Sequence, residues 1–160
     1  MIKITEVNQS DKINELIELY AESFGKKKSE NEWEWTHIQN PQFSNETEVI
    51  VALDKNEIVG ARPFMYTEMW INNKKVKAAQ HCDTMVHPKY QRKGIFSKMG
   101  KYSIKYLERK GFELSYGFPN ELSRKGFLKQ GYKKLVETET LFKILNPQIV
   151  SSKIKNRFLA

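Results

Sequence analysis

The first part of the chain shows two kinds of periodicity, which predict one strand followed by two helices. Residues 2–7 alternate between apolar and polar side chains, the period of a half-buried strand. In residues 11–24 the apolar positions recur at helical spacing, and Gly25 marks the end of that helix. Residues 29–41 favour a second, shorter helix closed by Pro41, because the residue before a proline avoids helical backbone angles.

Three longer apolar stretches follow, and the short polar turns between them predict an antiparallel meander. The stretches cover residues 47–54, 57–71 and 74–87, and the turns fall at residues 55–56 and 72–73. A proline inside the middle stretch indicates a bulge or an edge position, because proline cannot donate a hydrogen bond to a neighbouring strand.

The second half of the chain predicts a helix, a strand, a short helix and a final strand. Residues 94–111 place apolar side chains on one face and basic side chains mostly on another, the pattern of a surface helix. Residues 112–118 are predicted as strand, residues 121–131 as a short helix and residues 132–145 as strand.

These elements fit one domain of mixed composition. A chain of 160 residues has the length of a single domain, and its order β-α-α-β-β-β-α-β-α-β predicts an α/β (α+β) fold. In this fold, helices flank one central sheet that is mixed but mostly antiparallel. We expect residues 1–146 to form the domain and residues 147–160 to be a basic tail, which docks on it, reaches a partner or continues into a longer protein.

Composition narrows the class of protein further. No apolar run approaches the ~20 residues of a membrane span, and the first residues carry charge where a signal peptide is apolar. We therefore expect a cytoplasmic protein without a membrane partner, either a monomer or a homodimer. The single cysteine, Cys82, excludes an internal disulfide and a zinc site made of cysteines, so no metal is expected and a buried core thiol is predicted.

The positive charge is concentrated in one part of the chain. The net charge is +8, and residues 74–134 hold 16 Lys and Arg against 4 Asp and Glu, while the remainder holds 11 against 15. An anionic partner is expected to meet the protein in this basic part. The alternative is an ordinary lysine-rich surface that faces solvent.

The turn before the long predicted helix carries the clearest chemical signal. Gln91, Arg92, Lys93 and Gly94 follow a predicted strand and lead directly into a helix N-terminus. Backbone N–H groups at such a point form an anion site, and glycine allows a phosphate to approach the backbone closely. Neither the P-loop pattern nor the dinucleotide pattern G-x-G-x-x-G is present, so nucleoside triphosphates and NAD do not follow.

The stretch VHPKYQRKGIFSKM resembles the acetyl-CoA-binding motif of the GNAT superfamily of N-acetyltransferases, (R/Q)-x-x-G-x-(G/A). Gln91 and Gly94 match this motif, whereas Phe96 stands where the family prefers glycine or alanine. The later stretches YGFPN and FLKQGYKKL resemble the family's next strand and the short helix closed by Gly131 and Tyr132. The resemblance implies a GNAT-like fold over nearly the whole chain and acetyl-CoA as co-substrate.

The resemblance also implies which residues hold the coenzyme. The backbone of residues 91–96 would hold the pyrophosphate, and the strand before it would pair with the pantetheine arm. Phe127 takes the position of a tyrosine that commonly protonates the departing thiolate in this family. The implied coenzyme-binding residues are Met85, Val86, Gln91, Arg92, Lys93, Gly94, Ile95, Phe96, Asn120 and Phe127.

Transfer of an acyl group to an amine requires a base, an oxyanion site and a proton for the thiolate. Alternation along the strand predicts Asp83 and His81 on one face, so Asp83 is the candidate base or ammonium anchor and His81 the reserve. A phenyl ring cannot donate a proton, so Tyr116, Tyr132 or water would replace the usual tyrosine. Cys82 as an acyl-carrying nucleophile is a weaker candidate, because no low-pKa setting is evident.

Aromatic residues indicate where the acceptor binds. Four of them, in the second helix and the middle strand, are predicted to line an acceptor pocket: Trp33, Trp35, Tyr66 and Trp70. The alternative is that they belong to the ordinary core. Glutamates beside them favour a cationic acceptor.

The sequence therefore predicts an acetyl-CoA-dependent N-acetyltransferase that moves an acyl group to a primary amine, small or protein-borne, by direct attack. Phe96 and Phe127 favour an alternative, a catalytically weak acyl-CoA-binding or sensor domain of the same fold. A third interpretation is a nucleic-acid-binding module that uses the lysine-rich helix. No specific nucleic acid is expected, because basic charge alone supports only weak, salt-sensitive binding.

Overall fold

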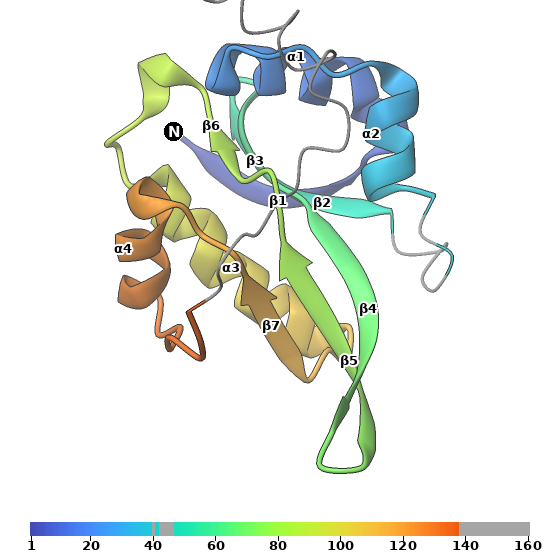
Figure 1. Cartoon of the computed structure of the whole chain (residues 1–160). Coiled ribbons are helices and arrows are strands. Elements are labelled where there is room, and N and C mark those ends of the chain that lie inside the picture. Colours follow the sequence, from blue (N-terminus) through green and yellow to red (C-terminus); the bar gives the residue numbers. More distant parts are fainter. Residues whose placement is uncertain (40, 42–46, 138–160) are drawn as a thin grey trace, which may run out of the picture.

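A computed structural model of the chain describes residues 1–39, 41 and 47–137, and Figure 1 shows how its elements are arranged. The strands are β1 (Lys3–Asn8), β2 (Glu48–Asp54), β3 (Glu57–Arg62), β4 (Phe64–Ile71), β5 (Lys74–His81), β6 (Met85–Val86) and β7 (Leu114–Gly117). The helices are α1 (Ile13–Phe24), α2 (Glu30–His37), α3 (Ile95–Arg109) and α4 (Glu121–Lys129), with short 3-10 turns η1 (Ser10–Lys12) and η2 (Pro88–Tyr90).

The strands form two hydrogen-bonded sheets, so the expectation of one central sheet is corrected. One sheet has the order β1-β2-β3-β6, and the other has the order β4-β5-β7. All pairs are antiparallel except β5 with β7. The chain passes from β3 into β4 and from β5 into β6, so the predicted mixed, mostly antiparallel arrangement is confirmed, with breaks in two of the expected long strands.

A bulge accounts for both breaks. Ala61 pairs with Met85, and Phe64 pairs with His81. Between these two pairs, two residues lie on the β3–β4 side and three on the β5–β6 side, so the β5–β6 side has one extra residue. Asp83, the middle residue of these three, has a φ of 43°, a backbone angle that residues other than glycine rarely adopt. Such an insertion bends the strand and ends the strict alternation of side chains.

Helices cover both faces of the sheets and enclose two cores (Figure 1). On the face covered by α1 and α2, the buried residues include Leu16, Leu19, Trp33, Val51 and Met85. On the face covered by α3, they include Ile50, Phe64, Tyr66, Met99 and Tyr106. The apolar stripe predicted for α3 is confirmed, because its members are buried while its lysines lie on the outer face.

Both predicted hairpin turns are confirmed. The backbone has positive φ at both central residues, with values of 51° and 82° in one turn and 49° and 61° in the other. Two successive residues of positive φ make the turn whose twist matches that of antiparallel strands. Three of these four positions are asparagine, Asn56, Asn72 and Asn73, a residue that tolerates this backbone region.

Other expectations need adjustment at element ends. The second helix ends at His37, earlier than Pro41, and its start has a capping box between Ser29 and Glu32. Residues 132–137 form no strand, and the remainder of the expected last strand and the basic tail lie outside the described residues. Within the described parts of the chain, no helix is long and apolar enough to cross a membrane.

Candidate functional site

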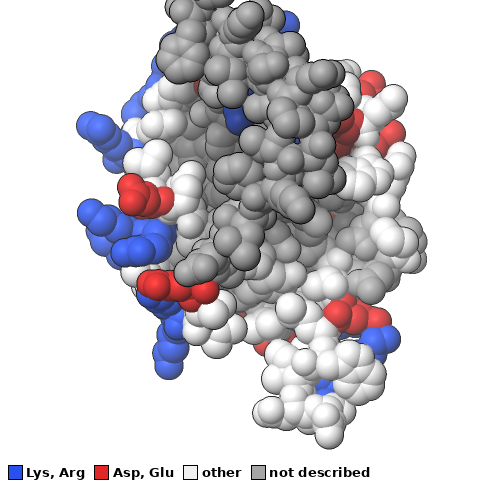
Figure 2. Space-filling model, viewed as in Figure 1, with Lys and Arg blue, Asp and Glu red and all other residues white. Residues whose placement is uncertain are grey.

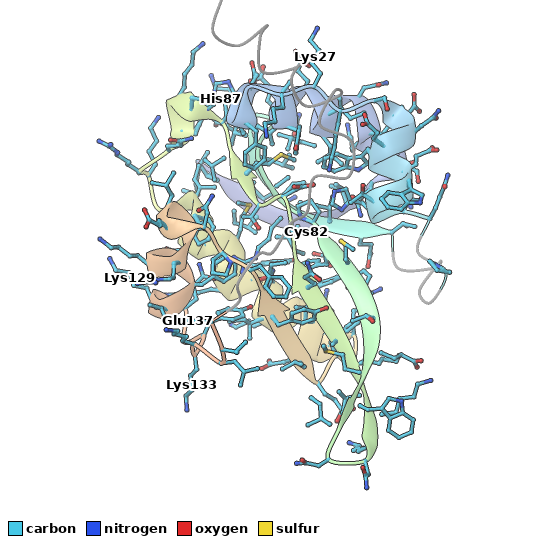
Figure 3. All side chains as sticks on the ribbon, viewed as in Figure 1. Lys27, Cys82, His87, Lys129, Lys133 and Glu137 are labelled. Atoms are coloured by element: carbon cyan, nitrogen blue, oxygen red, sulfur yellow. The ribbon has the colours of Figure 1, made fainter. Side chains whose placement is uncertain are left out.

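A pocket opens where β6 and β7 separate. β7 pairs with β5 as far as His81, whereas β6 pairs only with β3 among the described strands. The resulting pocket has a volume of about 240 Å³. Its lining includes His81, Cys82, Asp83 and Thr84 around the bulge, Phe118 and Asn120 from the segment that leads into α4, and Phe127 of α4 itself. Figure 3 shows Cys82 near the centre of the molecule, between the two helix layers.

Asp83 binds two cationic or potentially cationic groups from the α1–α2 side. Its Oδ2 atom lies 2.5 Å from Nζ of Lys28 and 3.1 Å from Nε2 of His37. Burial raises the pKa of Asp83, but the hydrogen bonds from His37 and Lys28 and the ammonium charge outweigh it and lower the pKa to about 2. Asp83 is therefore an ionised anchor for cations at neutral pH.

The fold of α2 brings His37 to this carboxylate. The capping box at Ser29 fixes the first turn, and Trp33, one turn before His37, is fully buried. The indole N–H donates to Gln9, and the ring centroids of Trp33 and His37 lie 4.4 Å apart. Burial lowers the pKa of His37, and Asp83 only partly opposes this effect. The imidazole is therefore neutral at neutral pH.

Cys82 lies against the other nitrogen of the same imidazole. Its Sγ atom is 3.7 Å from Nδ1 of His37, and burial, assisted by the charge of Asp83, raises the pKa of the thiol to about 12. Burial thus dominates the setting of the thiol, but Cys82 as a residue is partly exposed and lines the pocket, so the prediction of a buried core thiol is only partly correct.

The pKa of Asp83 makes part of the stability dependent on pH. Because the folded-state pKa lies below the ordinary 3.8, this carboxylate stabilises the fold above about pH 4, and the contribution is lost as the pH falls towards 2. We expect the free energy of unfolding to fall by about 2 kcal/mol more in the wild type than in Asp83→Asn between about pH 5 and pH 2. Urea denaturation at several pH values measures this difference.

The exposed Asp11→Asn variant serves as the control for that prediction, since it should keep the wild-type pH dependence. Equal pH dependence of the wild type and Asp83→Asn would contradict the role given to the Lys28 and His37 contacts.

His81 belongs to a separate buried polar cluster on the other side of the strand. Its Nδ1 atom accepts a hydrogen bond from Nε of Arg62 at 3.0 Å, and its Nε2 atom lies 2.5 Å from the hydroxyl of Tyr132 and 2.6 Å from that of Ser115. Arg62 is fully buried and also donates to Gln130 at 3.1 Å. Burial and the Arg62 charge hold the pKa of His81 well below its usual value, so this imidazole is neutral.

The expectation that Asp83 and His81 share a face is wrong. Asp83 and Cys82 both contact His37, whereas His81 contacts Arg62 and Tyr132. The extra residue of the bulge explains the difference, because strict alternation holds only in a regular strand. The pocket therefore has two chemically distinct walls.

Phe127 separates the pocket from a possible proton donor. The ring is almost buried and lies 5.5 Å from Phe96 and 5.1 Å from Tyr132, centroid to centroid. Tyr132 reaches the pocket wall through its contact with His81. Tyr116 packs against Phe118 and does not contribute to the pocket lining in the described structure.

The turn before α3 has the geometry of an anion site. Gly94 is the N-cap with a φ of 75°, and no side chain caps the first turn of the helix. Arg92 has a φ of 62°, and the Gln91 side chain donates to the carbonyl of Val86 at 3.2 Å, which ties the turn to β6. Figure 2 shows Lys and Arg side chains along the edge of the molecule that carries α4 and this turn.

The four aromatic residues predicted to line an acceptor pocket do not come together. Trp33 and Tyr66 are buried in the cores on opposite faces of the sheets. Trp35 and Trp70 are 76% and 73% exposed, and Trp70 lies near the end of the β4–β5 hairpin, far from α2 along the sheet (Figure 1). Only Trp33 lies close to the Asp83 cluster, through Lys28 and His37.

Sequence reasoning missed Lys28, His37, Arg62 and Ser115. A signal existed for His37, since a residue four positions after Trp33 lies on the same helix face. A signal also existed for Arg62, a cation inside an apolar stretch next to a proline. For Lys28 and Ser115 the local pattern offers none.

A second hollow, of about 300 Å³, lies over Ile4 and Tyr102 and is flanked by Lys98, Lys101 and Lys105 of α3. It is a lysine-rimmed surface depression remote from the bulge and contains no carboxylate, histidine or cysteine. Across the described part of the chain, no group of three or more His, Cys, Asp or Glu side chains is arranged to hold a metal ion.

Comparison with known proteins agrees with this fold. Solved structures of similar fold include glucosamine-6-phosphate N-acetyltransferase from Arabidopsis thaliana, with a TM-score of 0.66, 16% identity and coverage of 91% of this chain and 99% of that one. An aminoglycoside acetyltransferase from an uncultured soil metagenomic sample, in complex with sisomicin, has a TM-score of 0.62, 21% identity and coverage of 89% and 97%. A Trypanosoma brucei acetyltransferase has a TM-score of 0.64, 16% identity and coverage of 89% and 100%.

At these identities the likeness concerns the fold. A search of the curated proteins finds no match to this chain. The sequence itself matches the family described as "Acetyltransferase (GNAT) domain" over residues 4–135. Because this match spans most of the chain, the chain belongs to the GNAT family of acetyltransferases.

Proposed function

We propose that the chain is an acetyl-CoA-dependent N-acetyltransferase that moves an acetyl group to a primary amine. The observation that carries this proposal is the pocket between β6 and β7, whose β6 wall leads into the glycine-marked basic turn before α3. In acetyl-CoA the thioester and the pyrophosphate lie at opposite ends of the pantetheine arm, so the pocket suits the thioester and the turn suits the pyrophosphate.

The coenzyme would lie along β6 and end at the turn. The edge of β6 that faces β7 has no strand partner among the described residues, so an amide-containing arm can pair there, although the Val86 carbonyl already accepts a hydrogen bond from the Gln91 side chain. The unpaired N–H groups after Gly94 and the positive charge of Arg92 and Lys93 suit the pyrophosphate. Asn120 lines the pocket from the opposite side, at the N-cap of α4.

The acceptor would be a primary ammonium that binds at Asp83. This carboxylate already holds the ammonium of Lys28, whose Nζ atom also lies 4.8 Å from the Tyr20 ring centroid and 5.6 Å from that of Trp33. Such a carboxylate with aromatic neighbours suits cations. With a pKa of about 2, Asp83 is an anchor rather than a base, and the neutral imidazole of His37 beside it is the better proton acceptor.

Departure of the coenzyme thiolate requires a proton from the other wall. Phe127 carries no acidic proton, but His81 on the pocket wall contacts the hydroxyls of Tyr132 and Ser115. These hydroxyls and the imidazole form a chain along which a proton can reach the thiolate.

Calorimetric titration with acetyl-CoA and with desulfo-coenzyme A, followed by a thiol-release assay over a panel of primary amines, tests this function. We expect saturable binding of both coenzymes and thiol release that depends on the amine. Binding without release would favour the second candidate, an acyl-CoA sensor, which Phe127 in the usual tyrosine position supports. Absence of binding would contradict both.

A further inference from the structure

Three side chains on the α2 side of the pocket stand in a line: a thiol, an imidazole and a carboxylate. Sγ of Cys82 is 3.7 Å from Nδ1 of His37, and Nε2 of His37 is 3.1 Å from Oδ2 of Asp83. The three residues come from α2 and from the bulge, and Cys82 and Asp83 line the pocket where the thioester is proposed to lie.

The carboxylate fixes which nitrogen of His37 carries the proton. Asp83 is ionised and accepts hydrogen bonds only, so Nε2 of His37 carries the hydrogen and donates it. In a neutral imidazole, Nδ1 is then an acceptor, and it faces the Cys82 thiol. A nucleophile, a base and a group that orients the base therefore occur in the order that nucleophilic catalysis requires.

The same arrangement does not suit a metal ion. The thiol and the carboxylate contact opposite nitrogens of one ring, so the three groups diverge instead of meeting at a common point. Lys28 also places a positive charge on the Asp83 carboxylate, which a bound cation would have to displace. The line of groups thus suits covalent chemistry better than coordination.

We propose that Cys82 accepts the acetyl group from acetyl-CoA as a thioester, with His37 as the base and Asp83 as its positioning partner, and passes it on to the acceptor amine. This proposal rests on the proposed function, because acetyl-CoA must first bind in the pocket between β6 and β7. It adds a covalent route to direct attack by the amine.

The first step exchanges one thioester for another. The Cys82 sulfur forms a bond to the acetyl carbonyl carbon, and the bond between that carbon and the coenzyme sulfur breaks. The thiol proton moves to Nδ1 of His37 and from there to the departing coenzyme thiolate, so no oxidant or further reactant is needed. The hydroxyl of Thr84, which is buried without a hydrogen-bond partner among the described residues, is available to the tetrahedral oxyanion.

The second step regenerates the thiol. The neutral amine attacks the acetyl-Cys82 carbonyl, the C–N bond forms and the bond from the carbonyl carbon to the Cys82 sulfur breaks. The amine nitrogen gives up one proton to Nδ1 of His37, which passes it to the departing Cys82 sulfur. Because burial raises the pKa of Cys82, the resting thiol keeps its proton, and attack requires its transfer to His37 in the same step. Removing the imidazole should therefore slow acylation itself.

The test is to incubate the full chain with acetyl-CoA and no amine, quench in acid and measure the intact mass, then map the acetyl group to a peptide. We expect one acetyl group on Cys82 that neutral hydroxylamine removes, as it does from thioesters. Cys82→Ala should lack this adduct, and His37→Gln should form it roughly 100-fold more slowly. Addition of an amine from the panel should discharge the adduct.

Asn31→Gln, at an exposed position of α2, is the control. It leaves Cys82, His37 and Asp83 in place, so this variant should acylate Cys82 at the wild-type rate. Calorimetry with acetyl-CoA and thermal unfolding on every variant separate loss of chemistry from loss of binding or of fold.

Two results would overturn the inference while leaving the proposed function intact. One is a Cys82→Ala variant that binds acetyl-CoA and acetylates amines at the wild-type rate, with no thioester on the wild type. The other is a hydroxylamine-stable acetyl group on Lys28 in place of a thioester on Cys82, since Lys28 is the amine already held at Asp83. Absence of acetyl-CoA binding to the wild type would remove both the inference and the function on which it rests.

Discussion

Replacing Gly94 with glutamate is expected to weaken acetyl-CoA binding by roughly 100-fold or more, about 3 kcal/mol, and to leave the fold intact. The new carboxylate would stand at the N-cap of α3, where the proposed pyrophosphate approaches unpaired backbone N–H groups. Like charges at such close range repel strongly, and the side chain would fill the space that the phosphate needs. Calorimetric titration with acetyl-CoA gives the change in affinity directly.

The chain offers a closely matched control at the other end of the same helix. Gly94 and Gly111 have φ values of 75° and 77°, and a side chain at either position would meet nothing within 4 Å. A glutamate therefore has the same backbone cost at both sites. Gly111→Glu should bind acetyl-CoA like the wild type, with a similar loss of melting temperature in both variants.

Retained affinity in folded Gly94→Glu would remove the pyrophosphate from this turn. Equal losses of affinity in both variants would point to a general effect of backbone strain or added charge. Only a loss confined to Gly94→Glu supports the coenzyme position.

Hydrophobic periodicity predicted the helices and strands well. The periodicity shows which face of an element packs against a neighbouring layer, and this face follows from residue spacing within that element. The stripe of α3 and the turns at Asn56 and Asn73 are consequences of local spacing and local backbone preference. The bulge is different, because it depends on how two strands pair. Pro63 marked the disturbed position on one strand, but nothing local to residues 82–84 shows that three residues there oppose two.

The candidate site was predicted only in part because its contacts join distant segments. Asp83, predicted as a base or an ammonium anchor, does line the pocket, but its partners Lys28 and His37 lie 55 and 46 positions away in the sequence. Neither their nearness nor the direction of the Asp83 side chain follows from spacing. The assumption of regular alternation then placed His81 beside Asp83, whereas the bulge directs them to different walls.

The bulge gives the two walls different chemistry. On the α2 side, Cys82 and Asp83 share the imidazole of His37, and the Asp83 carboxylate binds the ammonium of Lys28, the kind of group that is proposed for the acceptor. On the α3 and α4 side, His81 is joined to hydroxyls and to a buried guanidinium, which suits a departing thiolate. One inserted residue thus separates the proposed proton-accepting and proton-donating groups.

Replacing His81 with leucine is expected to destabilise the fold by about 3 kcal/mol, chiefly because it leaves the buried Arg62 without its main partner. Arg62 is 0% exposed, and within the described residues it forms no ion pair with a carboxylate. Its Nε atom donates to His81, and its other contacts include the Gln130 amide, the Tyr132 hydroxyl and the faces of Phe96 and Phe127. Burial already lowers the pKa of Arg62 to about 10, which reflects the cost of keeping this charge from water.

The double variant Arg62→Met/His81→Leu tests this cause. Removal of the guanidinium removes the unpaired charge, so the double variant should be about 2 kcal/mol more stable than the sum of the two single changes predicts. Urea denaturation of the wild type, both single variants and the double variant gives this coupling. His87→Leu, at a half-buried histidine in the turn before α3, controls for loss of a histidine. If the two single changes in the free energy of unfolding simply add up in the double variant, His81 stabilises the fold by packing alone. The hydrogen bond between Arg62 and His81 would then contribute nothing to stability.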